Sequence, residues 1–188
     1  RVEVKGYNFQ AIFNLQTGAI QQLKYGERNI FLEGNGPQLD AYRAPTDNDA
    51  GMGYPSAWFQ NGLYDMQHTV KDWSYTAKKD GTYQLNFTVE SQGKEGADQK
   101  YSNRDRDPES AYRFGENKRA LKEDDLKFTT RQIYTIYRDG SIELQSAISA
   151  NRSNVVLPRI GYSMVLPSGL DAFDYRSCSR CRERRASR

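Results

Sequence analysis

The chain has 188 residues, a length that suits one large β-sandwich domain or two small domains and allows a buried core. The net charge is +3, but residues 176–188 contain six arginines and one glutamate, so the excess charge belongs to that segment. A surface that is basic throughout, as nucleic-acid binding would favour, is therefore excluded. The sequence also has no run of about 18 apolar residues, so we expect no membrane-spanning helix.

Aromatic residues are the most informative part of the composition. Hydrophobic residues make up only 37% of the chain, yet it contains 13 Tyr, 8 Phe and 2 Trp. A disordered chain would be poor in aromatic residues, whereas strands that bury one face and expose the other suit this mixture. The composition therefore predicts a folded protein built from half-buried strands.

Short turns join strand-like segments at three places along the chain. The turns are Gln16–Gly18, Lys79–Gly81 and Arg138–Gly140, and the flanking strand-like segments are 9–13 and 19–23, 83–89, and 128–137 and 142–148. In residues 83–89 the apolar side chains alternate with polar ones, which is the period of a half-buried strand. Asp-Gly at two of the turns supplies the positive φ that tight hairpins require. We therefore expect an all-β, antiparallel protein.

Three segments depart from this strand pattern. Residues 55–62 are a short helix candidate, because Pro fits a first helical turn and Gly a C-terminal stop. Residues 92–126 contain 17 charged residues of both signs, which predicts a long exposed loop or insertion, with a helix at 110–121 as the alternative. Residues 176–188 are interpreted as an arginine-rich tail outside a domain that covers residues 1–175.

The densest polar cluster spans Arg43–Gly53 and includes one Arg, two carboxylates and one amide within seven residues. Such residues often bond their own backbone in turns, so the cluster either caps itself or binds a ligand. An EF-hand calcium loop starting at Asp47 is excluded, because Trp58 stands at the twelfth position where a Glu is needed. Glycoside hydrolysis uses two carboxyl groups about 5 to 10 Å apart, and Asp47 and Asp49 could offer both only from one short loop.

Other reactive residues are few. The only histidine, His68, has no Gly-x-Ser-x-Gly nucleophile motif to serve, and we interpret it as an ordinary strand residue. Cys178 and Cys181 have the spacing of a zinc or redox pair, but a structural zinc site needs four ligands. We therefore predict no metal site in this chain.

Several aromatic residues closely follow the polar cluster. Rings beside carboxylates and Arg can stack on the C–H face of a sugar, while hydroxyls bond the polar groups. Most aromatic residues of a β protein belong to its core. We single out Trp58 as a candidate sugar contact because it lies close to the cluster.

Residues 42–51, Tyr-Arg-Ala-Pro-Thr-Asp-Asn-Asp-Ala-Gly, resemble the Arg-Ala-Pro-x-Asp-Asn-Asp-x-Gly signature of bacterial β-galactosidases of glycoside hydrolase family 2. That signature lies in their C-terminal small-chain domain, the fifth domain. Residues 9–18 are similar to the opening strand and Thr-Gly turn of that domain, Trp58 matches a Trp that follows the signature, and residues 157–161 resemble its late Arg-Ile-Gly strand. The resemblance covers roughly residues 5–174.

The resemblance implies a large antiparallel supersandwich of the galactose-mutarotase type. In that family two catalytic glutamates, with metal ligands beside them, lie in a central (β/α)₈ barrel that this chain lacks. We therefore assign no catalytic residue, no metal and no cofactor to the chain, and any divalent cation to the barrel of the parent enzyme. The residues that the resemblance places near the galactoside are Arg43, Asp47, Asn48, Asp49 and Trp58, and those of a mobile loop bordering the pocket are Gly51, Met52, Gly53 and Tyr54.

The sequence departs from the family after Asp174. The family continues with a Trp-Gly-x-Gly-Pro segment that contributes an aromatic sugar contact, whereas Tyr175 is followed here by the arginine-rich tail. A shift of reading frame near residue 175 would explain the departure. We therefore expect a domain truncated at its C-terminus, with edge strands left unpaired.

Two functions remain open on this evidence, beside a purely structural domain in which Asp47 and Asp49 only bond loop amides. The first is the C-terminal domain of a retaining β-galactosidase, which lines the active site, supports assembly and is inactive alone. Its partners would be the other domains of the enzyme, a galactoside and further copies in a homo-oligomer, in the bacterial cytoplasm or periplasm. The second is an independent carbohydrate-binding module for galactose-type sugars. A mutarotase-type epimerase is disfavoured because it needs a pair of histidines.

Overall fold

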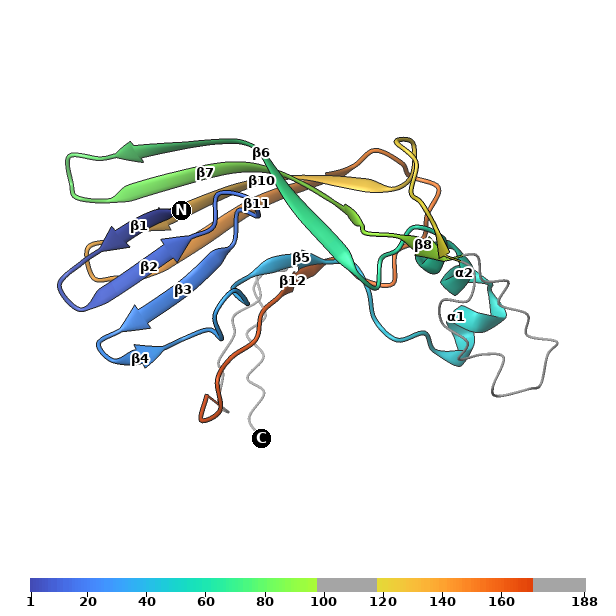
Figure 1. The fold of residues 1–188 in the computed structure, drawn as a ribbon, viewed down its shortest axis with the longest axis horizontal. Helices are drawn as coiled ribbons and strands as arrows, with labels where there is room; N and C mark the ends of the chain where they lie inside the picture. The colour runs from blue at the N-terminus through green and yellow to red at the C-terminus, as the bar shows by residue number, and fades with distance from the viewer. Residues whose placement is uncertain (98–117, 171–188) are drawn as a thin grey trace, which may run out of the picture.

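The computed structural model describes residues 1–97 and 118–170 of the chain. Its described part consists mainly of antiparallel strands, which confirms the all-β expectation (Figure 1). Two four-stranded sheets form one end of the molecule, and two short helices lie near the other end (Figure 1).

The first sheet is formed by the N-terminal part of the chain in the order β1-β2-β3-β4. Its strands are β1 Val2–Lys5, β2 Phe9–Phe13, β3 Ile20–Tyr25 and β4 Arg28–Asn29. The predicted turn around Gly18 joins β2 to β3, and this glycine adopts a left-handed φ of 73°. Such a conformation costs glycine little because it has no Cβ. The first predicted hairpin is therefore confirmed.

The second sheet has longer strands in the order β11-β10-β7-β6. These strands are β6 Met66–Ala77, β7 Tyr83–Gly93, β10 Lys127–Ile136 and β11 Ile142–Ala150. Turns containing Gly81 and Gly140, with φ of 80° and 88°, join β6 to β7 and β10 to β11. The Asp-Gly turns thus formed the two hairpins that the sequence predicts.

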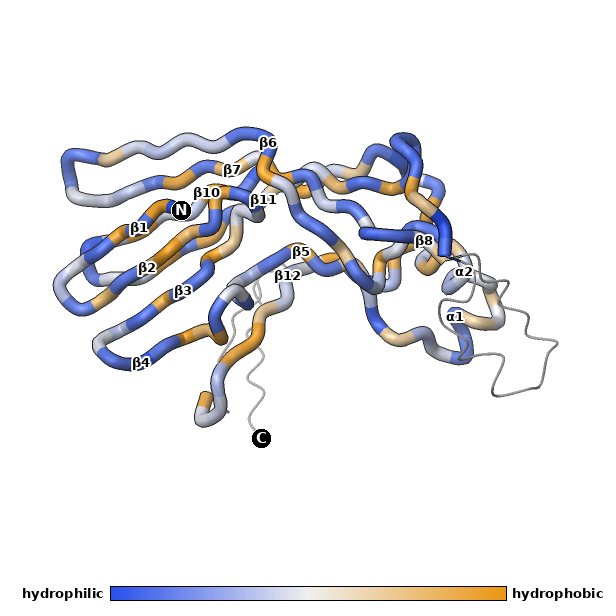
Figure 2. The backbone as a smooth tube through the Cα atoms, in the orientation of Figure 1, coloured by the Kyte–Doolittle hydropathy of each residue, from blue (hydrophilic) through white to orange (hydrophobic). Residues whose placement is uncertain are grey.

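The main hydrophobic core lies where the two sheets face each other. Alternate residues of β2, β7 and β10 fill it together with two residues of β3. Within it Phe13, Phe87 and Tyr134 form a cluster of aromatic rings with centroids 5.1–6.4 Å apart. Apolar residues recur along these strands in Figure 2. Full burial of side chains of this size contributes about 1.5–3 kcal/mol each, so this packing holds the two sheets together.

A second core cluster supports the helical end of the molecule. It brings together β5 Gln38–Asp40, the helix α2 Tyr54–Gln60 and the start of β10 through buried residues. Its fully or nearly fully buried members are Leu39, Ala41, Trp58, Leu63, Leu126 and Phe128. The strand β12 Gly161–Ser163 pairs with β5, and α1 Asp47–Gly51 precedes α2. The predicted helix at 55–62 is confirmed as α2.

The charged segment 92–126 differs from the expected exposed loop at both of its ends. The strand β7 continues to Gly93, and β8 Gly96–Ala97 pairs with β9 Lys118–Arg119. Asp125 and Leu126 are buried: Arg119 binds the Asp125 carboxylate, and Leu126 joins the second core cluster. The middle of this segment, most of the alternative helix at 110–121, and the tail at 176–188 lie outside the described residues.

Within the described ranges, neither helix is long and apolar enough to cross a membrane.

Candidate functional site

The polar cluster at residues 43–53 contains the short helix α1. Thr46 is the N-cap residue of α1, and its side-chain oxygen accepts a hydrogen bond from the backbone N–H of Asp49. The Asp49 carboxylate in turn accepts a bond of 2.8 Å from the Thr46 backbone N–H. This reciprocal pair is a capping box, which satisfies two N–H groups that a helix start leaves unpaired. The expectation of a loop over residues 47–51 is therefore corrected to a short, capped helix.

Arg43 binds the Asp49 carboxylate through both terminal guanidinium nitrogens. Its two nitrogens donate to the two Asp49 oxygens at 2.6 and 3.1 Å, and the Thr46 hydroxyl donates to the same carboxylate at 2.7 Å. The Arg43 hydrogen bonds, together with those from Thr46, hold the pKa of Asp49 well below its usual range. Asp49 therefore stays ionised at neutral pH, which suits a structural ion-pair partner and not a general acid.

The same arginine connects the signature to the late Arg-Ile-Gly segment. Arg43 Nε donates to the Pro158 carbonyl at 3.2 Å, and its guanidinium lies 5.6 Å from the centre of the Trp58 ring. The indole N–H of Trp58 donates to the Val156 carbonyl at 2.6 Å, and Arg159 forms an ion pair with Asp40 of β5. Residues 156–159 are thus attached to the signature by Arg43, and to the flanking elements α2 and β5 by Trp58 and Asp40.

Trp58 does not have the position that the sequence suggested. Its side chain is only 1% exposed, on the inner face of α2 and within the second core cluster. Its ring therefore offers no free face for a sugar to stack on. The structure places Trp58 as a core residue beneath Arg43.

Two of the exposed signature residues have polar side chains without a bonded partner among the described residues. Asp47 and Asn48 occupy the first turn of α1 and are exposed, and among the described residues no partner group bonds either side chain. Met52, which follows α1, is also exposed. Arg43 anchors the start of α1 through Asp49, so the carboxylate of Asp47 and the amide of Asn48 stand at a fixed helix start.

Comparison with known protein families shows which family this chain belongs to. A family model described as the beta galactosidase small chain matches residues 5–178. The protein belongs to the β-galactosidase small-chain family. It is therefore one part of a β-galactosidase and associates with other subunits or domains of that enzyme. No curated protein and no solved structure matches the sequence.

The structure divides the expected mobile loop, Gly51–Tyr54, between the two helices of the small chain. Gly51 is the last residue of α1, whereas Gly53 is the N-cap of α2 with a left-handed φ of 73°. Tyr54 is already the first residue of α2, so the expected mobile loop is reduced to Met52 and Gly53 between two helices. A residue with a side chain would resist the conformation of Gly53 but not that of Gly51.

The other reactive groups that the structure describes form no site. His68 lies in β6 with its Nδ1 atom 2.9 Å from the Ser91 hydroxyl, and burial lowers the pKa of the imidazole. Among the described residues, no group of three or more His, Cys, Asp or Glu is placed to hold a metal ion. Cys178 and Cys181 fall outside the described ranges.

The sequence predicted the exposed residues of the site but not the residues that support them. Thr46 stands three residues before Asp49, a spacing that signals a capping box and could have predicted α1. The pairing of Asp40 with Arg159 joins residues 119 positions apart, and no local signal could have revealed it.

Proposed function

We propose that this small chain completes the galactoside site of a retaining β-galactosidase of glycoside hydrolase family 2, whose catalytic groups lie in another domain. The observation that carries the proposal is the pair of exposed side chains, Asp47 and Asn48, held at the start of a capped and anchored helix. The Asp47 carboxylate can accept hydrogen bonds from sugar hydroxyls, and the Asn48 amide can both donate and accept.

Geometry supports a binding role rather than a catalytic one. Retaining hydrolysis needs an acid and a nucleophile about 5 Å apart on opposite sides of the sugar bond. Asp49 is engaged by Arg43 and Thr46, so the signature offers only one free carboxylate. Two glutamates of the parent enzyme's barrel would supply the chemistry, with any divalent cation beside them. The small chain alone would then be inactive.

Met52 and Gly53, between α1 and α2, form the segment of the proposed site that can move. They form the only connection between α1 and α2, and the left-handed Gly53 can absorb a change of backbone direction. We propose that this connection moves when a galactoside enters. We also propose that the parent enzyme is a homo-oligomer of the bacterial cytoplasm or periplasm.

The experiment is a comparison of variants in the complete β-galactosidase. Asp47→Asn removes the free charge and should lower kcat/KM by at least about tenfold, since hydrogen bonds to charged groups contribute about 1.5–3 kcal/mol. Asp72→Asn is the matched control, because this exposed carboxylate lies in β6 of the second sheet and not at the helical end. Equal kinetics for the two variants would remove Asp47 from the galactoside site.

Binding by the isolated chain tests the alternative function. A carbohydrate-binding module should show saturable backbone amide shifts around residues 43–58 when galactose or lactose is added in NMR titrations. The burial of Trp58 argues against this outcome, because the signature then lacks an aromatic platform for the sugar. We expect unchanged spectra from the folded chain, and saturable shifts would favour the binding module.

A further inference from the structure

The edge of the sandwich at β1 and β6 leaves a row of aromatic residues uncovered. Trp73 and Tyr75 of β6 lie directly opposite Phe87 and Leu85 of β7, so all four share the face that looks toward the first sheet. Phe87 and Leu85 are each 2% exposed, because the first sheet covers them. Trp73 and Tyr75 are 38% and 66% exposed. The second sheet thus extends beyond the first on this side.

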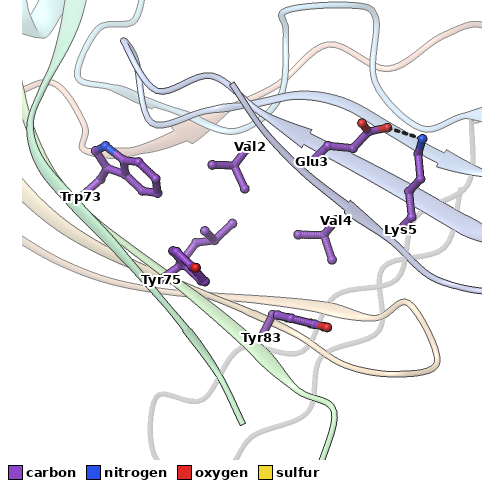
Figure 3. Close-up of a pocket in the computed structure, with 8 residues that line it drawn as sticks. Val2, Glu3, Val4, Lys5, Trp73, Tyr75 and Tyr83 are labelled. Carbon is purple, nitrogen blue, oxygen red and sulfur yellow. Dashed lines mark ion pairs between the residues drawn. The ribbon is translucent and has the colours of Figure 1, made fainter.

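A cavity of about 250 Å³ lies under this overhang. The aromatic rings of Trp73, Tyr75 and Tyr83 border it on one side, and Val2 and Val4 of β1 border it on the other (Figure 3). Glu3 and Lys5 point away from these rings and form an ion pair of 3.0 Å with each other. The interior of the cavity is therefore mostly apolar, which suits aliphatic side chains better than a sugar.

The strand that borders the cavity has a free edge. In the described part of the chain β1 pairs with β2 alone, as the last strand of its sheet. Every second residue of such an edge strand directs its N–H and C=O groups outward, where another strand can pair with them. A strand added beside β1 would also lie under Trp73 and Tyr75, where the first sheet ends.

We propose that an extended segment from another subunit of the β-galactosidase pairs with β1 and fills this cavity with alternate aliphatic side chains. Its remaining side chains would lie on the outer face, where a basic residue fits opposite Glu3 and an acidic residue opposite Lys5. This inference takes its partner from the small-chain family and does not depend on the galactoside site at α1.

A second copy of this chain fits the edge less well. A twofold pairing of β1 with the β1 strand of another copy would place the overhanging β6 strands of both copies over the same two strands. The two overhangs would then compete for one space. An extended segment without its own overhanging sheet has no such conflict.

Tryptophan quenching can test the proposal directly, because the chain has only two tryptophans. Trp58 is 1% exposed, so acrylamide should quench mainly Trp73. When the chain is mixed with the remaining chains of its β-galactosidase, we expect Trp73 to become protected and its emission to move to shorter wavelength. A Trp73→Phe variant should lose the quenchable signal, which identifies its source.

An affinity measurement provides the second readout. Tyr75→Lys places a charge in the cavity at a position exposed enough to leave the fold intact, and it should weaken assembly by at least about tenfold. Tyr137→Lys is the control, because Tyr137 is exposed beside the turn between β10 and β11 and does not line the cavity. It should leave the affinity unchanged.

The outcomes separate this proposal from the proposed function. An active complex in which Trp73 stays quenchable, or in which Tyr75→Lys binds normally, would overturn the strand pairing and leave the galactoside site standing. Protection of Trp73 by self-association of the isolated chain would make a second copy the occupant and also overturn it. A failure of the chains to assemble would overturn both proposals.

Discussion

Replacing Trp58 by phenylalanine should lower the free energy of unfolding of the small chain by about 2 kcal/mol. The variant loses the 2.6 Å hydrogen bond from the indole N–H to the Val156 carbonyl, a bond that contributes about 0.5–1.5 kcal/mol. It also leaves a gap in a fully buried site of the second core cluster. Complete truncation in Trp58→Ala should cost more, about 3–5 kcal/mol.

Thermal unfolding followed by circular dichroism measures this effect. A loss of about 2 kcal/mol corresponds to a fall in Tm of about 4–8 °C for a chain of this size. Trp73→Phe is the matched control, since Trp73 is partly exposed and its replacement in the isolated chain should change stability by less than about 0.5 kcal/mol. Kinetics of the assembled enzyme are recorded in parallel. If Trp58→Phe kept its Tm while galactoside affinity fell, Trp58 would be a sugar contact and the core assignment would be wrong.

Two further predictions concern a backbone turn and pH. Gly62 has a left-handed φ of 64°, and a Cβ there would lie 2.2 Å from the Glu95 carbonyl oxygen, so Gly62→Ala should destabilise the chain by at least about 2 kcal/mol in urea unfolding. Gly53→Ala, at a similar φ but with no atom within 4 Å of the added Cβ, should cost only about 1 kcal/mol, and equal losses would contradict the steric argument. Burial lowers the pKa of His68 in the folded chain. The neutral imidazole therefore contributes its full stabilisation above the pKa of the unfolded chain, about 6.5. This contribution is lost as the pH falls through the lower pKa of the folded chain. Urea unfolding at a series of pH values should show a weaker dependence in His68→Gln, and an identical dependence would show that another group titrates.

The amino-acid sequence by itself determined the local elements of this protein. Asp-Gly turns and alternating apolar residues predicted the β6–β7 and β10–β11 hairpins, because a hairpin depends on residues close together in the chain. The helix α2 was predicted for the same reason, from a Pro near its start and a Gly just past its end. The signature at residues 42–51 pointed to the β-galactosidase family, which the comparison with known families confirmed.

Only the tertiary structure decided what the signature residues do. Asp47 and Asp49 are two positions apart and chemically alike, yet Arg43 binds Asp49 and leaves Asp47 exposed. Trp58 followed the signature as a sugar-stacking residue would, but its burial follows from packing against β5 and the start of β10. The overhang at Trp73 exists because one sheet ends at β1 while the other continues to β6. These features depend on contacts between distant residues, and no local sequence pattern records such contacts.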